Sequence, residues 1–293
     1  MRKNLHLGFL LLMAAVGFSC CSGSDGMDLL SMTDNGAEGV EVPEILLSQE
    51  PLWTANRDFG YLDTSDYMTT DGNTLLWHDN LGRLTTIVLY IPATMDVSEL
   101  YQNPSSVSQL NGKYFQLGSD NELRLCDEIR SEAVQNDFNT SGMASGCEYY
   151  EQYYKGLKVF GAGYAVNYYM TPKGKRLAIA TGRLLTDLSV DTNPLISEKQ
   201  AKRIFGARLG DKVTKDWEAE LMVREYCIKT GDKDELDERL IWHVKGTLYP
   251  EEEAFMITSL SSTAVKGPLR HEAQIDAHTG RLLIEGHSLS LSY

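Results

Sequence analysis

The centre of the chain, residues 147–196, reads CEYYEQYYKGLKVFGAGYAVNYYMTPKGKRLAIATGRLLTDLSVDTNPLI. It is dense in aromatic and β-branched residues, which is typical of strands. Three strands are expected, at 148–155, 164–170 and 176–185. Pro172-Lys173-Gly174 supplies the turn that joins the last two strands as a hairpin. A carbohydrate site is one interpretation of the tyrosines; we favour sheet-filling residues, because aromatic side chains pair well across strands.

The part of the chain that follows begins with a helix signal. Ser197 and Gln200 form a capping box, and Gly210 ends the apolar stripe that follows it. Strands are expected after the helix, at about 217–228, 239–248, 254–260 and 270–276. The charged run 232–238 is interpreted as a solvated loop, and Gly280 as part of a tight turn before a last strand. One helix followed by an antiparallel sheet is an α+β pattern.

The part of the body that precedes the centre, residues 45–146, has a mixed pattern. Strands at 74–77 and 84–91 flank turn-forming residues, so a hairpin is expected. Ser119 and Glu122 form a second capping box, and apolar residues follow at helical spacing, which predicts a helix over about 120–137. The small and polar residues 140–146 are interpreted as a linker.

Residues 147–196 resemble the propeptide motif of fungalysin- and thermolysin-type metallopeptidases, abbreviated FTP. The matching positions are Tyr150, Gln152, Tyr154, Lys155, Gly156, Leu157, Val159, Phe160, Gly161, Gly174, Gly182, Pro194, Ile196 and Ser197. Cys147 stands where the family often has histidine. Residues 197–293 resemble the PepSY domain that follows in such propeptides, with Asp276-Ala-His-Thr-Gly280 as the signature turn.

The resemblance implies an α+β fold in which antiparallel sheets each carry a packed helix, preceded by the mixed α+β segment 45–146. It implies a protein that inhibits its enzyme and helps it fold through surface complementarity. No peptidase follows the module in this sequence, so the expected partner is a secreted metallopeptidase bound in trans. The alternative is a structural or surface-assembly lipoprotein that uses these modules as generic interaction domains.

Motifs that carry chemistry argue against an enzyme. His271-Glu272 begins like the zinc motif HExxH, but Ile275 stands at the position of the second histidine. The segment also has a strand pattern, on which residues four apart do not converge as they do on a helix. No phosphate-binding loop or nucleophile motif is present in the sequence. We therefore expect no catalytic residue, no metal site and no cofactor.

The N-terminus has the pattern of a bacterial lipoprotein signal. Basic residues at 2–3 precede a short apolar run, and small residues then precede Cys20, whose thiol is the expected lipid attachment site. Cys21 is a competing site, and an ordinary secretory signal is the alternative. Residues 1–19 are thus assigned as signal peptide and residues 20–44 as a flexible acidic tether. The expected location is the bacterial cell envelope, anchored by lipid to a membrane and facing the periplasm or the exterior.

The net charge indicates which class of partner to exclude, and the cysteine spacing indicates which kind of metal site to exclude. The formal net charge is −14, which disfavours binding to nucleic acid. Three cysteines lie in the body, Cys126, Cys147 and Cys227, and their spacing is not that of a zinc site. One disulfide or three buried thiols both agree with the sequence.

Acylation at Cys20 can be tested directly. Mass spectrometry of the mature protein should find diacylglycerol on an N-terminal Cys20, and Cys20→Ser should abolish it because the attacking sulfur is gone. Lipid on Cys21, or an unmodified N-terminus elsewhere, contradicts the assignment.

Overall fold

The computed structural model describes residues 41–53, 67–79, 81–91, 95–131, 144–209, 213–230, 233–249, 253–257 and 264–289. Residues 1–40 lie outside the described residues; they include the predicted signal peptide, Cys20 and most of the predicted tether. The helices are α1 (Glu44–Leu47), α2 (Val97–Leu100), α3 (Val107–Leu110), the π-helix η1 (Asn111–Phe115) and α4 (Glu198–Leu209).

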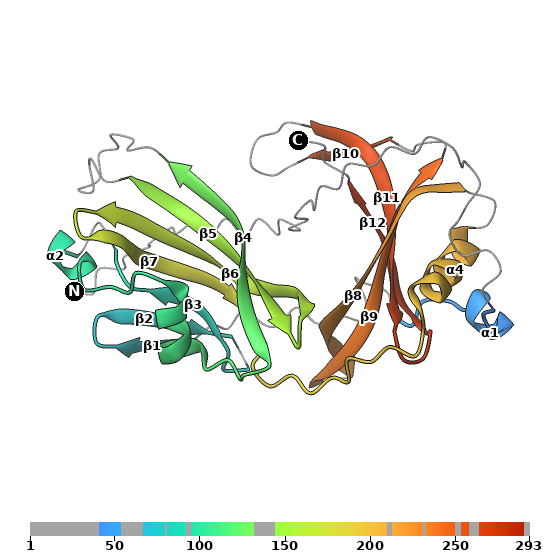
Figure 1. Ribbon diagram of the computed structural model, residues 1–293, viewed down its shortest axis with the longest axis horizontal. Helices are drawn as coiled ribbons and strands as arrows, with labels where there is room; N and C mark the ends of the chain where they lie inside the picture. The colour runs from blue at the N-terminus through green and yellow to red at the C-terminus, as the bar shows by residue number, and fades with distance from the viewer. Residues whose placement is uncertain are drawn as a thin grey trace, which may run out of the picture.

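The described strands form one sheet of 12 strands. Figure 1 shows its two halves, the first with β1 to β7 and the second with β8 to β12. They are β1 (Tyr67–Asp71), β2 (Thr74–His78), β3 (Leu84–Val88), β4 (Asn121–Ser131), β5 (Ser145–Tyr154), β6 (Leu157–Thr171), β7 (Gly174–Arg183), β8 (Val213–Thr230), β9 (Lys233–Tyr249), β10 (Glu253–Ile257), β11 (Ala264–Asp276) and β12 (Leu282–Leu289). The main path runs β1-β2-β3-β7-β6-β8-β9-β11-β10; β4 and β5 extend from β6, and β12 pairs with β11.

The predicted fold class, separate antiparallel sheets each with a packed helix, is wrong. The start of β6 pairs in parallel with β8, with Lys158 opposite Met222 and Val159 opposite Val223. This pairing makes one mixed sheet out of segments that were assigned to different modules. The first segment also joins the sheet, because β3 pairs with β7 and β4 pairs with β5.

The helix predicted over 120–137 is wrong as well. Residues 121–131 form strand β4, which pairs antiparallel with β5 along its length. The register shifts between Leu125 and Asp127, so a β-bulge at Cys126 inserts one extra residue. Leu123, Cys126 and Ile129 have the three-residue spacing of a helix, but they form no single apolar face. Leu123 is opposite Gln152 of β5 and Ile129 is opposite Cys147, which point to opposite sides of the sheet. Residues 132–137 lie outside the described residues.

Other local predictions agree with the structure. The hairpins β2–β3 and β6–β7 form where turn residues were found. The capping box of α4 is present: Ser197 N donates to Gln200 Oε1 at 2.9 Å, and Gln200 N donates to Ser197 Oγ at 3.3 Å.

The run 232–238 was expected as a loop, but β9 begins within it, at residue 233. Residues 145–146 of the expected linker begin β5, and 140–143 lie outside the described residues.

The main apolar clusters line one side of the sheet. α3 and η1 pack there on the first half, against Tyr164 and Val166 of β6. α4 packs on the second half, against Val244 of β9 and Ile275 of β11. Between them a third cluster joins the two halves, with members Tyr154, Val159, Ala162, Leu185, Leu188, Val190, Val223, Leu240 and Ala277. The FTP-like and PepSY-like segments therefore share buried surface.

Two glycines of the central segment have conformations or neighbours that exclude a side chain. Gly161 has φ of 70°, a left-handed value that favours glycine, and it lets both Val159 and Ala162 face the shared core. Gly182 lies opposite Tyr164 on β6, and a Cβ atom there would overlap the carbonyl oxygen of Gly163. The close approach of β6 and β7 thus depends on Gly182.

Gly182→Ala should lower the free energy of unfolding by about 2–3 kcal/mol, because the added methyl group forces the strands apart. Gly112→Ala is the matched control, since a Cβ atom there meets nothing within 4 Å. Urea unfolding measures both. Equal effects of the two changes contradict the assignment of Gly182.

Candidate functional site

Most residues of the FTP-like match build the sheet. Gln152 is fully buried, and its carboxamide binds the backbone of Leu185 twice: Nε2 donates to the carbonyl oxygen at 2.6 Å, and Oε1 accepts from the amide at 2.9 Å. Nε2 also donates to Asn121 Oδ1 at 2.7 Å. Tyr154 and Val159 are buried in the shared core. Gln152 therefore links β5 to the segment that leaves β7, and its role is structural.

Phe160 is the exception, because it faces the side of the sheet opposite α3, η1 and α4. Side chains alternate along a strand. Phe160 and His243 are next to the buried Val159 and Val244, so they point to this opposite side. Phe160 contacts His243 there with ring centroids 5.2 Å apart. The guanidinium group of Arg224 lies 4.4 Å from the centroid of the Phe160 ring.

Two sets of side-chain contacts lie on this side of the sheet. One runs from β4 to Lys158 of β6, and the other runs from Phe160 of β6 to β11. We call the two sets together the cross-strand ribbon; its members are Arg124, Glu151, Tyr153, Lys158, Phe160, Arg224, His243 and Glu272. Arg124 stacks on Tyr153 at 3.8 Å, and Lys158 Nζ lies 2.5 Å from Glu151 Oε1. His243 Nε2 lies 3.1 Å from Glu272 Oε2. The ribbon thus spans both halves of the molecule.

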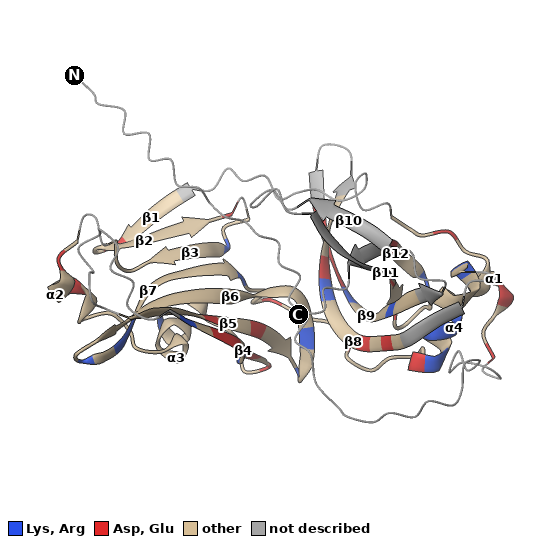
Figure 2. Ribbon diagram, turned by 90° about the horizontal axis from the view of Figure 1, so that it is seen from above, with Lys and Arg blue, Asp and Glu red and all other residues tan. Residues whose placement is uncertain are grey.

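Burial and neighbouring groups shift the pKa values of two charged residues of the ribbon, Glu272 and Arg224. Burial alone would raise the pKa of Glu272, but the hydrogen bond and the charge of His243 outweigh it, so the pKa is lowered. Burial lowers the pKa of Arg224, which packs on aromatic rings. Figure 2 shows acidic and basic residues over both halves of the molecule rather than in one block.

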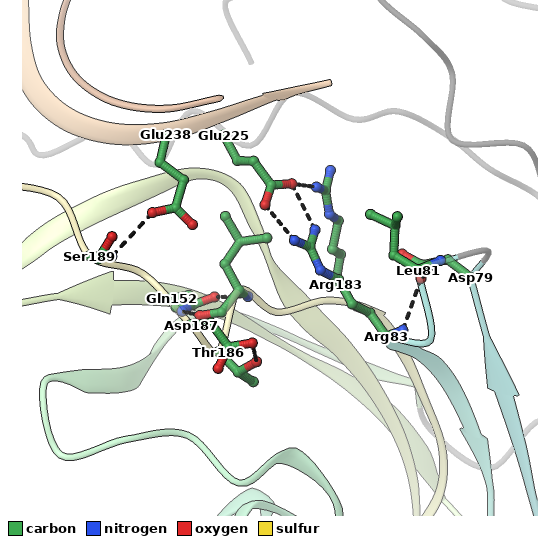
Figure 3. Close-up of polar contacts among 11 residues, drawn as sticks. Asp79, Leu81, Arg83, Gln152, Arg183, Thr186, Asp187, Ser189, Glu225 and Glu238 are labelled. Atoms are coloured by element: carbon green, nitrogen blue, oxygen red, sulfur yellow. Dashed lines mark hydrogen bonds and ion pairs between the residues drawn. The ribbon is translucent and has the colours of Figure 1, made fainter. Parts of the chain in front are cut away.

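A buried ion triad connects the two halves beside the ribbon (Figure 3). Glu225 of β8 has a side chain that is 1% exposed, and it accepts two hydrogen bonds from Arg83, at 2.7 and 2.5 Å. Arg183, at the end of β7, binds the same carboxylate. Burial lowers the pKa of Arg183. Asp79 fixes the turn that carries Arg83 by accepting from its amide at 2.9 Å.

A surface pocket of about 350 Å³ lies near the triad and includes Glu238 and Asp276 in its lining. The carboxylates that line it are engaged in structural contacts. Glu238 accepts from the amide of Ser189 at 3.1 Å. Burial opposes ionisation of Asp276, but hydrogen bonds from two backbone amides and from Arg239 outweigh it and lower its pKa. Asp276 thus holds the PepSY-like turn in place.

The other residues singled out from the sequence are separated in space. His271 lies on strand β11, opposite His287 of β12, which confirms the strand interpretation of this segment. Among the described residues, no three of His, Cys, Asp and Glu are placed to hold a metal ion. No disulfide joins Cys126, Cys147 and Cys227 in the described part of the chain. Burial raises the pKa of the Cys147 thiol.

Sequence reasoning missed the ribbon and the triad. Arg83, Arg183 and Glu225 are far apart along the chain, and no spacing rule connects them. The ribbon has the same property, because its members come from separate strands. Only Phe160 carried a signal, through its place in the FTP-like match.

Comparison with known proteins leaves the family open. No protein-family model matches the chain, and no curated protein matches it. One solved structure with some similarity is the Bacillus megaterium YpeB C-terminal domain, at 14% identity. The match covers 78% of this chain and 91% of that one, with a TM-score of 0.28. A TM-score this low carries no argument about fold or function. In the described residues no helix is long and apolar enough to cross a membrane.

Glu225→Gln should lower the free energy of unfolding by about 2–3 kcal/mol, because two arginines then share a site without their counter-charge. The control is Glu198→Gln, which removes an exposed pair with Lys202 and should cost about 0.5 kcal/mol or less. Urea unfolding at neutral pH compares the two. A cost at Glu225 no larger than at Glu198 contradicts the role of the triad.

Proposed function

We propose that this protein is a non-catalytic lipoprotein of the bacterial cell envelope that binds a protein partner. The observation that carries the proposal is the cross-strand ribbon, which runs across both halves of one sheet on the side opposite α3, η1 and α4. Its aromatic and arginine side chains are of the types that are enriched at the centres of protein interfaces. The lipid on Cys20 holds the protein at the membrane.

The proposed partner is a secreted metallopeptidase, which the protein restrains or helps to fold. This finer statement is supported by the resemblance of residues 147–196 to the FTP motif. The burial of Gln152, Tyr154 and Val159 agrees with it, because a module that acts by surface complementarity needs a rigid sheet. The triad at Glu225 adds to that rigidity by tying the halves together.

A second candidate is a surface-assembly lipoprotein that uses the same modules for other partners. Cys147 favours it, because this residue replaces the histidine of the family. Cys147 lies on β5 in the same alternation as Glu151 and Tyr153, so it belongs to the ribbon's side of the sheet. Any peptidase contact made by that histidine is absent in this chain.

Titration of the purified protein against metallopeptidases encoded nearby tests the proposal. Dose-dependent inhibition, or a higher refolding yield of the enzyme, is the expected result. Arg124→Glu should weaken the effect about tenfold, because it reverses a charge on the ribbon. Lys199→Glu makes the same charge change on α4, on the other side of the sheet, and should leave the effect unchanged.

Neither inhibition nor improved refolding at micromolar protein, with any such enzyme, contradicts the peptidase partner and leaves the surface-assembly function. Equal losses from Arg124→Glu and Lys199→Glu place the binding surface elsewhere. Thermal unfolding of both variants shows whether the fold is retained.

A further inference from the structure

Arg224 of β8 is a half-buried arginine of the ribbon that lacks a carboxylate partner. Its guanidinium group lies 4.4 Å from the centroid of the Phe160 ring and 4.8 Å from that of the Tyr226 ring. Within the described part of the chain, these ring contacts are made without any hydrogen bond or ion pair to the guanidinium group. Its nitrogen atoms are not among the buried atoms that lack a partner, so they are open to solvent.

Two arginines close by are bound differently. Arg83 and Arg183 both bind the carboxylate of Glu225. Burial lowers the pKa of Arg224, because removal from water disfavours the charged form. A partly desolvated charge without a counter-charge lowers stability rather than raising it. The unpaired guanidinium group therefore calls for an explanation other than stability of the fold.

The residue opposite Arg224 does not supply the missing charge. That residue is Arg239 of β9, and like charges directly opposite each other are unfavourable in a sheet. The charge of Arg239 is compensated by Asp237 at 2.9 Å and by Asp276 at 2.7 Å. Arg224 thus breaks a rule of strand pairing that its neighbour satisfies, and such exceptions are expected where a residue serves a function.

The aromatic rings hold the guanidinium group of Arg224 in place. Tyr226 packs on Trp53 with ring centroids 4.8 Å apart, and Phe160 contacts the ring of His243 at 5.2 Å. Both rings that touch Arg224 are therefore fixed by further contacts. An arginine that stacks on fixed rings loses little conformational freedom when its N–H groups bind a ligand.

We propose that Arg224 is the anchor of a carboxylate-binding site on the ribbon, and that its ligand is an acidic side chain of the protein partner. A guanidinium group can donate two parallel hydrogen bonds to the two oxygen atoms of a carboxylate. A single negative charge suits the site, because Glu272 acts on Arg224 and would repel a second one. This inference rests on the proposed function and names the chemistry that the partner contributes.

The test measures how a small carboxylate protects Arg224 from phenylglyoxal, a reagent that modifies guanidinium groups. The purified full-length protein in detergent is treated with and without 100 mM N-acetylglutamate α-amide, about ten times the dissociation constant expected for two charge-assisted hydrogen bonds. Sodium chloride keeps the ionic strength constant. Mass spectrometry of peptides should show that modification of Arg224 is about tenfold slower with the carboxylate present.

Matched controls are available in the same samples. In the described part of the chain, Arg281 has neither an aromatic contact nor an ion pair of its side chain, so its modification should slow less than about twofold. N-acetylglutamine amide has nearly the same shape without the charge and should protect neither arginine. Inorganic phosphate, the other common ligand of arginine, should protect Arg224 less than the carboxylate does.

A variant tests the role of the rings. Phe160→Leu removes one of the two rings and should reduce the protection of Arg224 to about threefold or less. Tyr101→Leu removes a ring that contacts Lys173 elsewhere and should leave the protection unchanged. Circular dichroism shows whether each variant folds, and the comparison of ligands in the wild-type protein stands without them.

Equal modification of Arg224 with and without the carboxylate overturns the site and makes this arginine a packing residue. Equal or stronger protection by phosphate overturns the preference for a carboxylate. Protection of Arg224 without an effect of the protein on any peptidase keeps the site and rejects the peptidase partner. Inhibition of a peptidase without protection of Arg224 keeps the proposed function and rejects the site.

Discussion

Strand β6 takes part in three pairings, and the architecture depends on this one element. Its first residues pair in parallel with β8, and the rest of the strand pairs with β5 and β7. A regular strand would turn the wrong side chains toward the core after the change of partner. Gly161 resolves this conflict, because its positive φ shifts the alternation so that Val159, Ala162 and Tyr164 all face buried clusters.

The two sides of the sheet have different roles as a consequence. One side carries α3, η1, α4 and the largest buried clusters, and it supplies the hydrophobic stabilisation of the fold. The other side carries the cross-strand ribbon, in which aromatic rings lie among paired charges. Glu225 connects the halves at the point where they meet, so the ribbon is displayed on a single body.

The structure shows what two positions of the propeptide-like motif do in this fold. Gln152 and Gly182 were matched as motif positions, and the structure gives them architectural roles: a carboxamide that binds the Leu185 backbone, and a site with no room for a side chain. Phe160 of the motif lies on the opposite side of the sheet, where it packs against the cluster of Trp53, Met222 and Tyr226.

The sequence predicted those features that depend on residues close together along the chain. The capping box at Ser197, the hairpin turn at Pro172–Gly174 and the tight turn at Gly280 each depend on a few adjacent residues, and the structure confirms them. The prediction failed at strand β4. Its apolar residues have a helical spacing, but pairing with β5, with a bulge at Cys126, makes the segment a strand. The single sheet, the triad at Glu225 and the ribbon could not be predicted from the sequence for the same reason. Each joins residues distant along the chain, and their contacts exist only once β6 has brought the two halves together.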